Sequence, residues 1–443
     1  MRLLKIIWRF LDLIFKFLFN FLFFLLLFIL KFYFLITPKD KKKSTICILK
    51  RYQDTIDRHQ KSNASEYLKI LFKRDPFKYV YVLCVGDGKN RIIRWSNNVI
   101  QIDINISTFS ALAKIFPHLT VSIRNFLAFL RTACFLRNKN IGIIENDFPN
   151  NLVFRCIYLK IALSVRLVTK VIGNIDLIFS QTLFPIFFPF KMKGKFGVSA
   201  IQLYDYLVSF LFFKSCSLII GANKDNMDNA LAKGANPQNT YLLRIKVDQN
   251  ITTYPVIERR NLIGFPKDGR IILLWSRIAP EMMIDRSLLA ITPILKEKKD
   301  VHFVIIGTGS EVEKIKQLGI KNGVEAQLHL VGYQNRQYIK SAVMCSDLIL
   351  SPYGGSSLVE AGLLKAPVVA FEYEWQNELI LDYVTGLLAD FRSADDIMKK
   401  VKYMLEQPKE AKKFGEQLYS VTSSMFDINA IEDKSRYIYG QIS

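Results

Sequence analysis

Hydrophobic residues dominate positions 1–36, and the few polar residues there recur at helical spacing. They are Arg2, Lys5, Arg9, Asp12, Lys16, Asn20 and Lys31. At about 100° per residue they fall within an arc of about 100°, which predicts a long helix with one narrow polar stripe and a wide apolar face. Such a helix can lie in a membrane interface, with its Lys and Arg side chains reaching the lipid headgroups.

A membrane-spanning helix is the alternative interpretation of the same stretch. Residues 17–36 include only Asn20 and Lys31 as strongly polar positions and are long enough to cross a bilayer. No small-residue cleavage site comes after them, which argues against a cleaved signal peptide. The basic cluster Lys39 and Lys41–Lys43 favours a cytoplasmic position for the residues beyond it. Both interpretations make residues 1–43 a membrane anchor and basic linker, with the catalytic domains on the cytoplasmic side.

After residue 44, short apolar runs alternate with amphipathic stretches. This βαβα pattern indicates an α/β fold with parallel sheets covered on both faces. The predicted strands 79–85, 141–144 and 217–220 end at three loops, Gly86-Asp87-Gly88, Glu145-Asn146-Asp147 and Gly221-Ala222-Asn223. Ligands of open α/β sheets bind beyond the carboxyl ends of the strands, so we expect these loops to line a binding cleft.

A turn-rich stretch at 252–269 separates this region from a second α/β unit, which begins with the predicted strand 271–275. Two α/β halves of similar size joined by a short linker predict one cleft between two domains. We place the first domain at 44–255 and the second at 256–423.

The amino-acid composition indicates that the protein binds an anionic partner. The 443 residues include 61 Lys and Arg against 39 Asp and Glu, a net charge of +22, and half of them are hydrophobic, which excludes a disordered chain. Basic and aromatic residues interleave at 152–171 and 184–196, as in surfaces that bind nucleic acid or membranes. No nucleic-acid recognition motif is present, so we favour a membrane lipid surface. The cysteines have no close pairs, which indicates reduced thiols. The histidines lack the spacing of zinc ligands, so we expect no zinc site.

The most informative stretch is 348–386. A predicted strand at 348–350 leads into Gly354-Gly355-Ser356-Ser357, after which comes a helix that carries Glu360. Two glycines let backbone N–H groups approach a ligand, and Ser356 or Ser357 can cap the helix. The helix N-terminus then suits a diphosphate, and Glu360, one turn further on, can accept hydrogen bonds from vicinal hydroxyls.

From about 271 to 424 the sequence resembles the C-terminal domain of family-4 glycosyltransferases of the GT-B fold. Six blocks match in order: Trp275-Ser276-Arg277 with Pro280-Glu281 and Asp285, 302–310, 330–333, 342–352, 355–369, and 378–380 with 385–388. The resemblance covers the second domain well and the first only loosely.

The resemblance implies two Rossmann-like domains facing a central cleft, with 424–443 as a helix crossing back to the first. It implies a nucleotide-diphosphate sugar donor and no metal or other cofactor. Arg277 would pair with the diphosphate and Glu360 with the ribose, as the catalytic residues. The remaining donor-binding positions would be Gly354, Gly355, Ser356, Ser357, Gly307 and Glu378, and the acceptor-side positions Gly86, Asp87, Gly88, Glu145, Asn146 and Asp147.

The implied function is a membrane-associated retaining glycosyltransferase that acts on a lipid-linked or membrane-proximal glycan. Pro352 stands where the family has a second Glu, Met282 where it has a Lys, and Ile172 where it has a His. The first two departures raise the alternative of a catalytically silent GT-B scaffold or glycan-binding subunit of a membrane glycan synthase. A nucleotide-sugar epimerase is a third alternative, which the membrane anchor disfavours.

Overall fold

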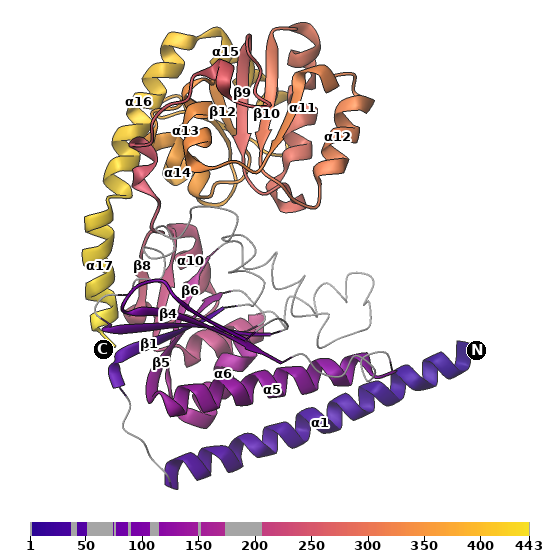
Figure 1. Ribbon diagram of the computed structural model, residues 1–443, viewed down its shortest axis with the longest axis vertical. Helices are drawn as coiled ribbons and strands as arrows, with labels where there is room; N and C mark the ends of the chain where they lie inside the picture. The colour runs from indigo at the N-terminus through magenta and orange to yellow at the C-terminus, as the bar shows by residue number, and fades with distance from the viewer. Residues whose placement is uncertain are drawn as a thin grey trace. The chain divides into compact units, whose positions relative to one another are not determined.

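The computed structural model describes residues 2–36, 42–50, 74, 77–86, 90–106, 115–148, 152–172 and 206–442. They form two compact units, Met1–Leu243 with Glu432–Ser443, and Arg244–Ile431. Each unit is built around its own largely parallel sheet with helices packed on it (Figure 1). The predicted α/β fold is therefore confirmed in both halves.

The sheet of the first unit has eight strands in the order β3-β4-β2-β1-β5-β6-β7-β8. Only the pairing of β3 with β4 is antiparallel. The strands are β1 (Lys42–Lys50), β2 (Tyr79–Gly86), β3 (Arg91–Arg94), β4 (Val99–Asn105), β5 (Ile141–Phe148), β6 (Arg166–Val171), β7 (Leu218–Gly221) and β8 (Thr240–Leu242).

Two strand predictions in this unit need correction. β1 begins at Lys42, so Lys42 and Lys43 belong to a strand rather than to the basic linker. β5 runs on to Phe148, so Glu145, Asn146 and Asp147 lie within the strand rather than in a loop behind it. The sequence pattern hid this extension because these three polar residues interrupt the apolar run.

The helices of the first unit are α1 (Arg2–Ile36), α5 (Pro117–Asn138), α6 (Val153–Leu163), the apolar helix Tyr206–Ser215, and α10 (Lys224–Ala232). Figure 1 shows α1 lying alongside α5. Within the described residues, α1 at Ile14–Tyr33 and α5 at Leu119–Asn138 are long and apolar enough to cross a membrane. Length and composition alone do not distinguish such a span from a helix that packs on a protein core.

Asp12 and Lys16 of the polar stripe of α1 are buried in the protein, contrary to our expectation that the stripe faces lipid headgroups. Asp12 is 2% exposed, and its Oδ1 accepts a hydrogen bond of 2.9 Å from the backbone N–H of Leu119, in the first turn of α5. Lys16 is also buried. Since the first backbone N–H groups of a helix lack intrahelical partners, the carboxylate of Asp12 ties α1 to the start of α5.

Aromatic contacts continue this helix packing toward the C-terminal half of α1. The ring of Phe23 lies 5.0 Å from that of Phe126, 5.3 Å from that of Phe129 and 5.0 Å from that of Tyr158. Phe126 and Phe129 belong to α5 and Tyr158 to α6. Phe23 and Leu27 are thereby part of the hydrophobic core of the first unit.

Residues 152–171, which we interpreted as part of a membrane-binding surface, fold into the core instead. They form α6 and the interior strand β6, and most of their apolar side chains are buried. The apolar residues that we assigned to lipid contact thus pack against the sheet and α5. The second basic-aromatic stretch, 184–196, lies outside the described residues.

The second unit contains six parallel strands in the order β11-β10-β9-β12-β13-β14. They are β9 (Arg270–Trp275), β10 (Val301–Ile306), β11 (Leu328–Gly332), β12 (Leu348–Ser351), β13 (Val368–Phe371) and β14 (Leu387–Ala389). Short β-branched runs such as Val368-Val369 suit strands buried on both faces, and the strands predicted from 271, 302, 348 and 368 are confirmed.

Helices cover both faces of this sheet. They are α11 (Ile284–Glu297), α12 (Val312–Lys321), α13 (Arg336–Met344), α14 (Ser356–Leu363), α15 (Ala394–Glu406) and α16 (Pro408–Met425). The last helix, α17 (Ile428–Gly440), is shared, because Glu432–Ser443 belongs to the first unit. There Arg166 Nη1 donates a 2.6 Å hydrogen bond to the carbonyl of Ile442.

Candidate functional site

In the second unit, the turn between β12 and α14 forms the candidate anion site. The cap of α14 is Gly355, and no side chain satisfies the first N–H groups of the helix, so the predicted Ser cap is wrong. A Cβ at Gly355 would meet no atom within 4 Å, so there is open space beside the residue that caps the helix. Unsatisfied N–H groups and the positive end of the helix dipole favour an anionic ligand at this position.

A neighbouring pair of side chains holds this turn in place. Trp375 Nε1 donates a 2.8 Å hydrogen bond to the carbonyl of Gly354, and the buried side chain of Gln376 bonds Ser351 Oγ at 3.2 Å and the carbonyl of Phe371 at 2.9 Å. A Cβ at Gly354 would lie 2.7 Å from Gln376 Cγ. Gly354 therefore serves close packing, whereas Gly355 faces open space.

A small pocket opens beside this turn, at the carboxyl ends of β9 and β12. Its lining includes Trp275, Ser276, Met282, Ser351, Pro352 and Ser357. Met282 and Pro352 are two of the three positions at which the sequence departs from the family pattern. The pocket wall there is apolar where the family supplies charges.

Glu360 lies behind the turn, inside the unit. It is 1% exposed, with Oε1 accepting a 2.8 Å hydrogen bond from Arg336 Nη2 and Oε2 a 3.2 Å bond from Trp275 Nε1. Burial raises the pKa of Glu360, and the charge of Arg336 opposes this shift. Arg336 also lies 3.5 Å from Asp248, so one guanidinium joins two carboxylates.

Arg277 comes directly after β9, on the surface of the unit. Its side chain is half-exposed and forms an ion pair with Glu281, four residues further along the chain. The geometry of this loop depends on Gly307, which follows β10 with φ of +144°. A Cβ at Gly307 would lie 1.8 Å from the carbonyl oxygen of Ser276, so only glycine allows the two loops to approach so closely.

Glu378 ends a 3-10 helix, Glu374–Glu378, and forms an ion pair with Arg244. Both side chains are mostly buried. The donor-side residues that the sequence predicts therefore all belong to the second unit, but Glu360, Glu378 and Arg277 are each engaged by a partner from the protein. The partners Arg336 and Arg244 had no motif in the sequence that marked them.

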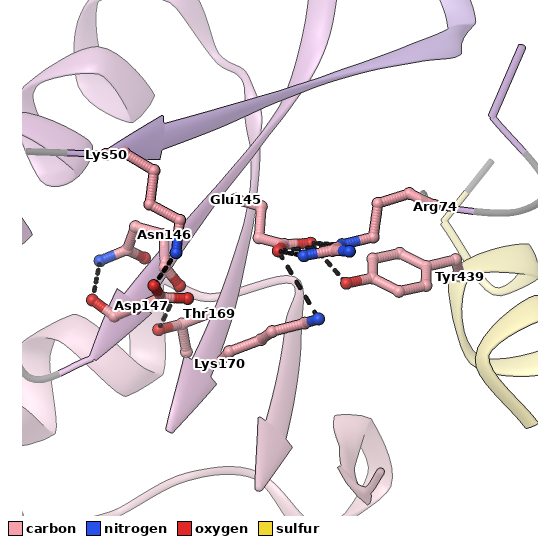
Figure 2. A network of polar contacts seen from close by, with 8 residues as sticks. All are labelled: Lys50, Arg74, Glu145, Asn146, Asp147, Thr169, Lys170 and Tyr439. Atoms are coloured by element: carbon pink, nitrogen blue, oxygen red, sulfur yellow. Dashed lines mark hydrogen bonds and ion pairs between the residues drawn. The ribbon is translucent and has the colours of Figure 1, made fainter. Parts of the chain in front are cut away.

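In the first unit, Glu145 is the centre of a buried network of charged groups (Figure 2). Arg74 Nη2 and Nε donate hydrogen bonds of 2.7 and 3.0 Å to its two carboxylate oxygens, Tyr439 donates a third, and Lys170 Nζ lies 3.8 Å away. These partners come from separate parts of the chain, including α17. The pairing of Glu145 with Tyr439 spans 294 residues of sequence.

The electrostatics of this network favour ionised Glu145. Burial by itself raises the pKa of Glu145, but the positive charges of Arg74 and Lys170 and the hydrogen bonds from Arg74 and Tyr439 outweigh it, and the pKa lies well below its usual range. Burial also lowers the pKa of Lys170 to about 8. The network thus ties the C-terminal segment to β5 through Glu145.

The other predicted acceptor-side residues lie at the ends of β5 and β2. Asp147 forms an ion pair with Lys50 of β1, and Oδ1 of the buried Asn146 has no hydrogen-bond partner among the described residues. Gly86 ends β2 and accepts a 2.9 Å hydrogen bond from the N–H of Ile106. Asp87 and Gly88 lie outside the described residues. Among the residues that the structure does describe, no group of three or more His, Cys, Asp or Glu side chains could hold a metal ion.

Residues 257–421 match the family model of glycosyl transferases group 1. The second unit carries a glycosyl transferases group 1 domain. Its strand-turn-helix at 348–363 and the pocket beside it lie within the matched range. The resemblance of the second half to this family, inferred from six sequence blocks, is confirmed.

Two curated relatives of the chain are named as transferases of sugar residues. The chain is 23% identical over 179 residues to alpha-D-kanosaminyltransferase of Streptomyces kanamyceticus, covering 40% of this chain and 46% of the relative. It is 22% identical over 295 residues to poly(ribitol-phosphate) alpha-N-acetylglucosaminyltransferase of Staphylococcus aureus, covering 66% and 59%. The chain thus spans about half the length of these relatives.

A solved structure establishes the fold of the chain as a whole. Anabaena HepE, crystallised with UDP and glucose, superposes with a TM-score of 0.62 at 16% identity over 88% of this chain and 97% of that one. The chain has the GT-B fold of glycosyltransferases.

Proposed function

We propose that this protein is a membrane-associated glycosyltransferase that moves a sugar from a nucleotide-diphosphate sugar to a lipid-linked or membrane-proximal glycan. The observation that carries the proposal is the uncapped start of α14, with open space at Gly355 and a pocket beside it, in a glycosyl transferases group 1 domain.

The proposed reaction breaks the bond between the anomeric carbon of the sugar and the diphosphate. The diphosphate leaves with the bonding electrons, and the acceptor hydroxyl forms the new bond with retained configuration and loses its proton. Backbone N–H groups at the start of α14 and the guanidinium of Arg277 would stabilise the charge that develops on the diphosphate. Arg277 is half-exposed, so it can leave Glu281 for a more highly charged anion.

Glu360 is proposed to bind the ribose hydroxyls. Its carboxylate is held by Arg336 and Trp275, which fix its orientation behind the turn. Arg336 is one-third exposed, so a shift of its side chain toward Asp248 would free Oε1 for a hydroxyl group. In this proposal Arg336 is a positioning residue, since it acts through Glu360.

No metal ion is part of the proposed reaction, because helix N–H groups and Arg277 supply the positive charge for the diphosphate. Transfer is expected to proceed at an unchanged rate after treatment with EDTA. A loss of transfer that added Mg²⁺ or Mn²⁺ restores would contradict this part of the proposal.

The direct test is transfer of radiolabelled sugar to membrane extracts, with a panel of nucleotide sugars as donors and the full chain as enzyme. We expect transfer from at least one donor, and a loss of about 100-fold or more when Arg277 is replaced by Ala, because a charge-stabilising group is removed from the transition state. Absence of both transfer and donor hydrolysis with every donor would contradict the proposal.

A catalytically silent scaffold or glycan-binding subunit is the second candidate, since Met282 and Pro352 give the pocket an apolar wall. This candidate predicts weak nucleotide binding or none. Restoring the family residues with the Met282→Lys and Pro352→Glu variants would then create no transfer. A glycosyltransferase would instead show transfer in the parent protein.

A further inference from the structure

The most unusual surface of the described structure is the outer face of α1. Twelve large apolar residues between Ile14 and Tyr33 are at least one-third exposed. At about 100° per residue they cover roughly half of the helix circumference, and the other half packs on α5 and α6. Soluble proteins rarely expose apolar patches of this size, which mark sites that contact a partner or a membrane.

Two polar residues of α1, Asp12 and Lys16, lie inside the protein and not at this face. Asp12 is bound to the start of α5, Lys16 is buried, and Phe23 packs between α5 and α6. A helix that crosses a bilayer would have to leave these contacts, carrying Asp12 and Lys16 away from α5. The packing therefore favours a helix that stays on the domain.

The length of α1 also favours a helix that lies along the membrane rather than across it. Its 35 residues extend about 52 Å at 1.5 Å per residue, well beyond a hydrocarbon core of about 30 Å. The exposed apolar residues are distributed along Ile14–Tyr33 on one side of the helix, as in helices that lie in a membrane interface.

The charge of the chain lies in the same unit as this face. Residues 244–431 contain 24 Lys and Arg against 23 Asp and Glu, and the remainder of the chain contains 37 against 16. The first unit therefore carries a net +21 of the total +22. Such a charge attracts the anionic leaflet of a membrane.

The helices that pack with α1 show this bias locally. α5 and α6 contain no Asp or Glu, and the single acidic residue of α1, Asp12, is buried. Arg131 and Lys31 are exposed, and the guanidinium of Arg137 lies 5.6 Å from the ring of the exposed Tyr33. Aromatic and Arg side chains at one helix end are typical of the membrane–water interface.

We propose that α1 lies in the plane of an anionic membrane, with its Phe- and Leu-rich face inserted among the lipids and Asp12 on its opposite side docked on α5, so that the first unit rests on the bilayer without crossing it. The occupant of the face is the lipid itself. The inference rests on the proposed membrane association and specifies how it is achieved.

Binding to vesicles tests the surface. The full chain is expected to float with vesicles of phosphatidylcholine and phosphatidylglycerol and only weakly with phosphatidylcholine alone. The triple variant Phe17→Gln, Phe21→Gln, Phe28→Gln should lower the partition to anionic vesicles by roughly 100-fold or more. The matched control Ile263→Gln, Leu289→Gln, Ile320→Gln changes three exposed apolar residues of the second unit and should leave the partition unchanged.

Depth measurements distinguish a helix in the plane from a spanning one. Single Phe17→Trp, Phe21→Trp, Phe28→Trp and Phe32→Trp variants are compared with the parent for fluorescence quenching by lipids brominated at different depths. The four positions lie on one side of α1, so an in-plane helix gives one shallow depth for all. A spanning helix would give a depth that changes by about 1.5 Å per residue, and that result would overturn the proposal.

Two further outcomes would also overturn it. One is equal flotation of the parent and the Phe triple variant, and the other is a parent that forms dimers in buffer, lost in that variant, without binding vesicles. The thermal shift caused by added UDP or GDP in each variant separates this proposal from the proposed transferase activity. The Phe variants should keep the parent's nucleotide response, whereas failure of the transferase proposal would remove it from the parent too.

Discussion

At the scale of single residues, Glu360 and Glu145 are each held by partners that the sequence did not mark. The glycine-rich turn before its helix predicted Glu360, and the resemblance to GT-B glycosyltransferases implied Arg277. The sequence did not indicate Arg336, which reaches Glu360 from another helix. Nor did it indicate the contact of Tyr439 with Glu145, since local patterns carry no information on pairs 294 residues apart.

The Glu145 network leads to a prediction about stability. Arg74→Ala removes both hydrogen bonds to a buried carboxylate and should destabilise the first unit by about 3–5 kcal/mol. Arg260→Ala, which breaks an exposed ion pair with Glu258, is the matched control and should cost less than about 1 kcal/mol. Urea denaturation monitored by circular dichroism measures both. Equal effects would contradict a buried network.

Low pH should destabilise the protein through Glu145. The pKa of Glu145 is lowered in the folded state, so its contribution to stability is present above the unfolded pKa of about 4.5 and is lost as the pH falls below it. Glu145→Gln should therefore show a shallower loss of melting temperature than the parent between about pH 5 and about pH 3. An unchanged acid profile would count against the ionised carboxylate.

The histidine pair of the second unit gives a separate pH dependence. His302 Nδ1 lies 3.0 Å from His329 Nε2, and burial, followed by the charge of His302, lowers the pKa of His329 to about 4. Because the folded pKa is below the unfolded value near 6.5, stability is full above pH 6.5 and is lost toward pH 4. Exposure limits the effect to about 1 kcal/mol. Calorimetric melting of His329→Gln should lack this loss, and an unaltered profile would refute it.

At the scale of elements, the strands and helices of the second unit follow from sequence because short apolar runs and amphipathic stretches alternate regularly there. The extent of β5 and the orientation of α1 could not be predicted in this way. β5 continues through three polar residues because neighbouring chain segments supply Arg74, Lys50 and Lys170 as partners. The polar stripe of α1 was recognised, but its direction depends on the position of α5, which a helical pattern cannot reveal.

Gly307 and Gly355 are expected to have different roles, the first in stability and the second in nucleotide binding. Gly307→Ala would place a Cβ 1.8 Å from a backbone oxygen at a φ of +144°, and we expect a loss of about 2–4 kcal/mol in unfolding free energy. Gly355→Ala meets open space, so it should change stability by less than about 1 kcal/mol while weakening nucleotide binding. Chemical denaturation and nucleotide titration of both variants check this contrast. A stability loss at Gly355 equal to that at Gly307 would contradict it.

At the scale of the whole molecule, charge and chemistry are divided between the two units. The first unit holds nearly all of the net charge and the apolar face of α1, and the second, almost neutral, holds the glycosyl transferases group 1 domain. The total charge of the sequence predicted an anionic partner. Nearly all of that charge lies in the first unit, which we propose binds a membrane. We propose that a few groups near the start of α14 bind the nucleotide instead.

This division predicts two different salt dependences. Flotation with vesicles containing phosphatidylglycerol should fall steeply as salt is raised, because the Debye length shortens to about 3 Å at 1 M salt. The affinity for a nucleotide diphosphate, measured by calorimetry over the same range, should change much less, since it depends on local N–H groups at α14. Parallel loss of both would show that one charged surface serves both ligands.

The proposed function requires that the second unit bind a nucleotide diphosphate at the start of α14, with Glu360 behind it. Calorimetric titration of the full chain with UDP, GDP and ADP tests this most directly, beside Glu360→Ala and the exposed control Glu416→Ala, with melting temperatures to confirm folding. We predict affinity in the micromolar range for at least one nucleotide, retained in Glu416→Ala and lost in Glu360→Ala. Absence of binding to all three nucleotides, or unchanged binding in a folded Glu360→Ala protein, would contradict the account.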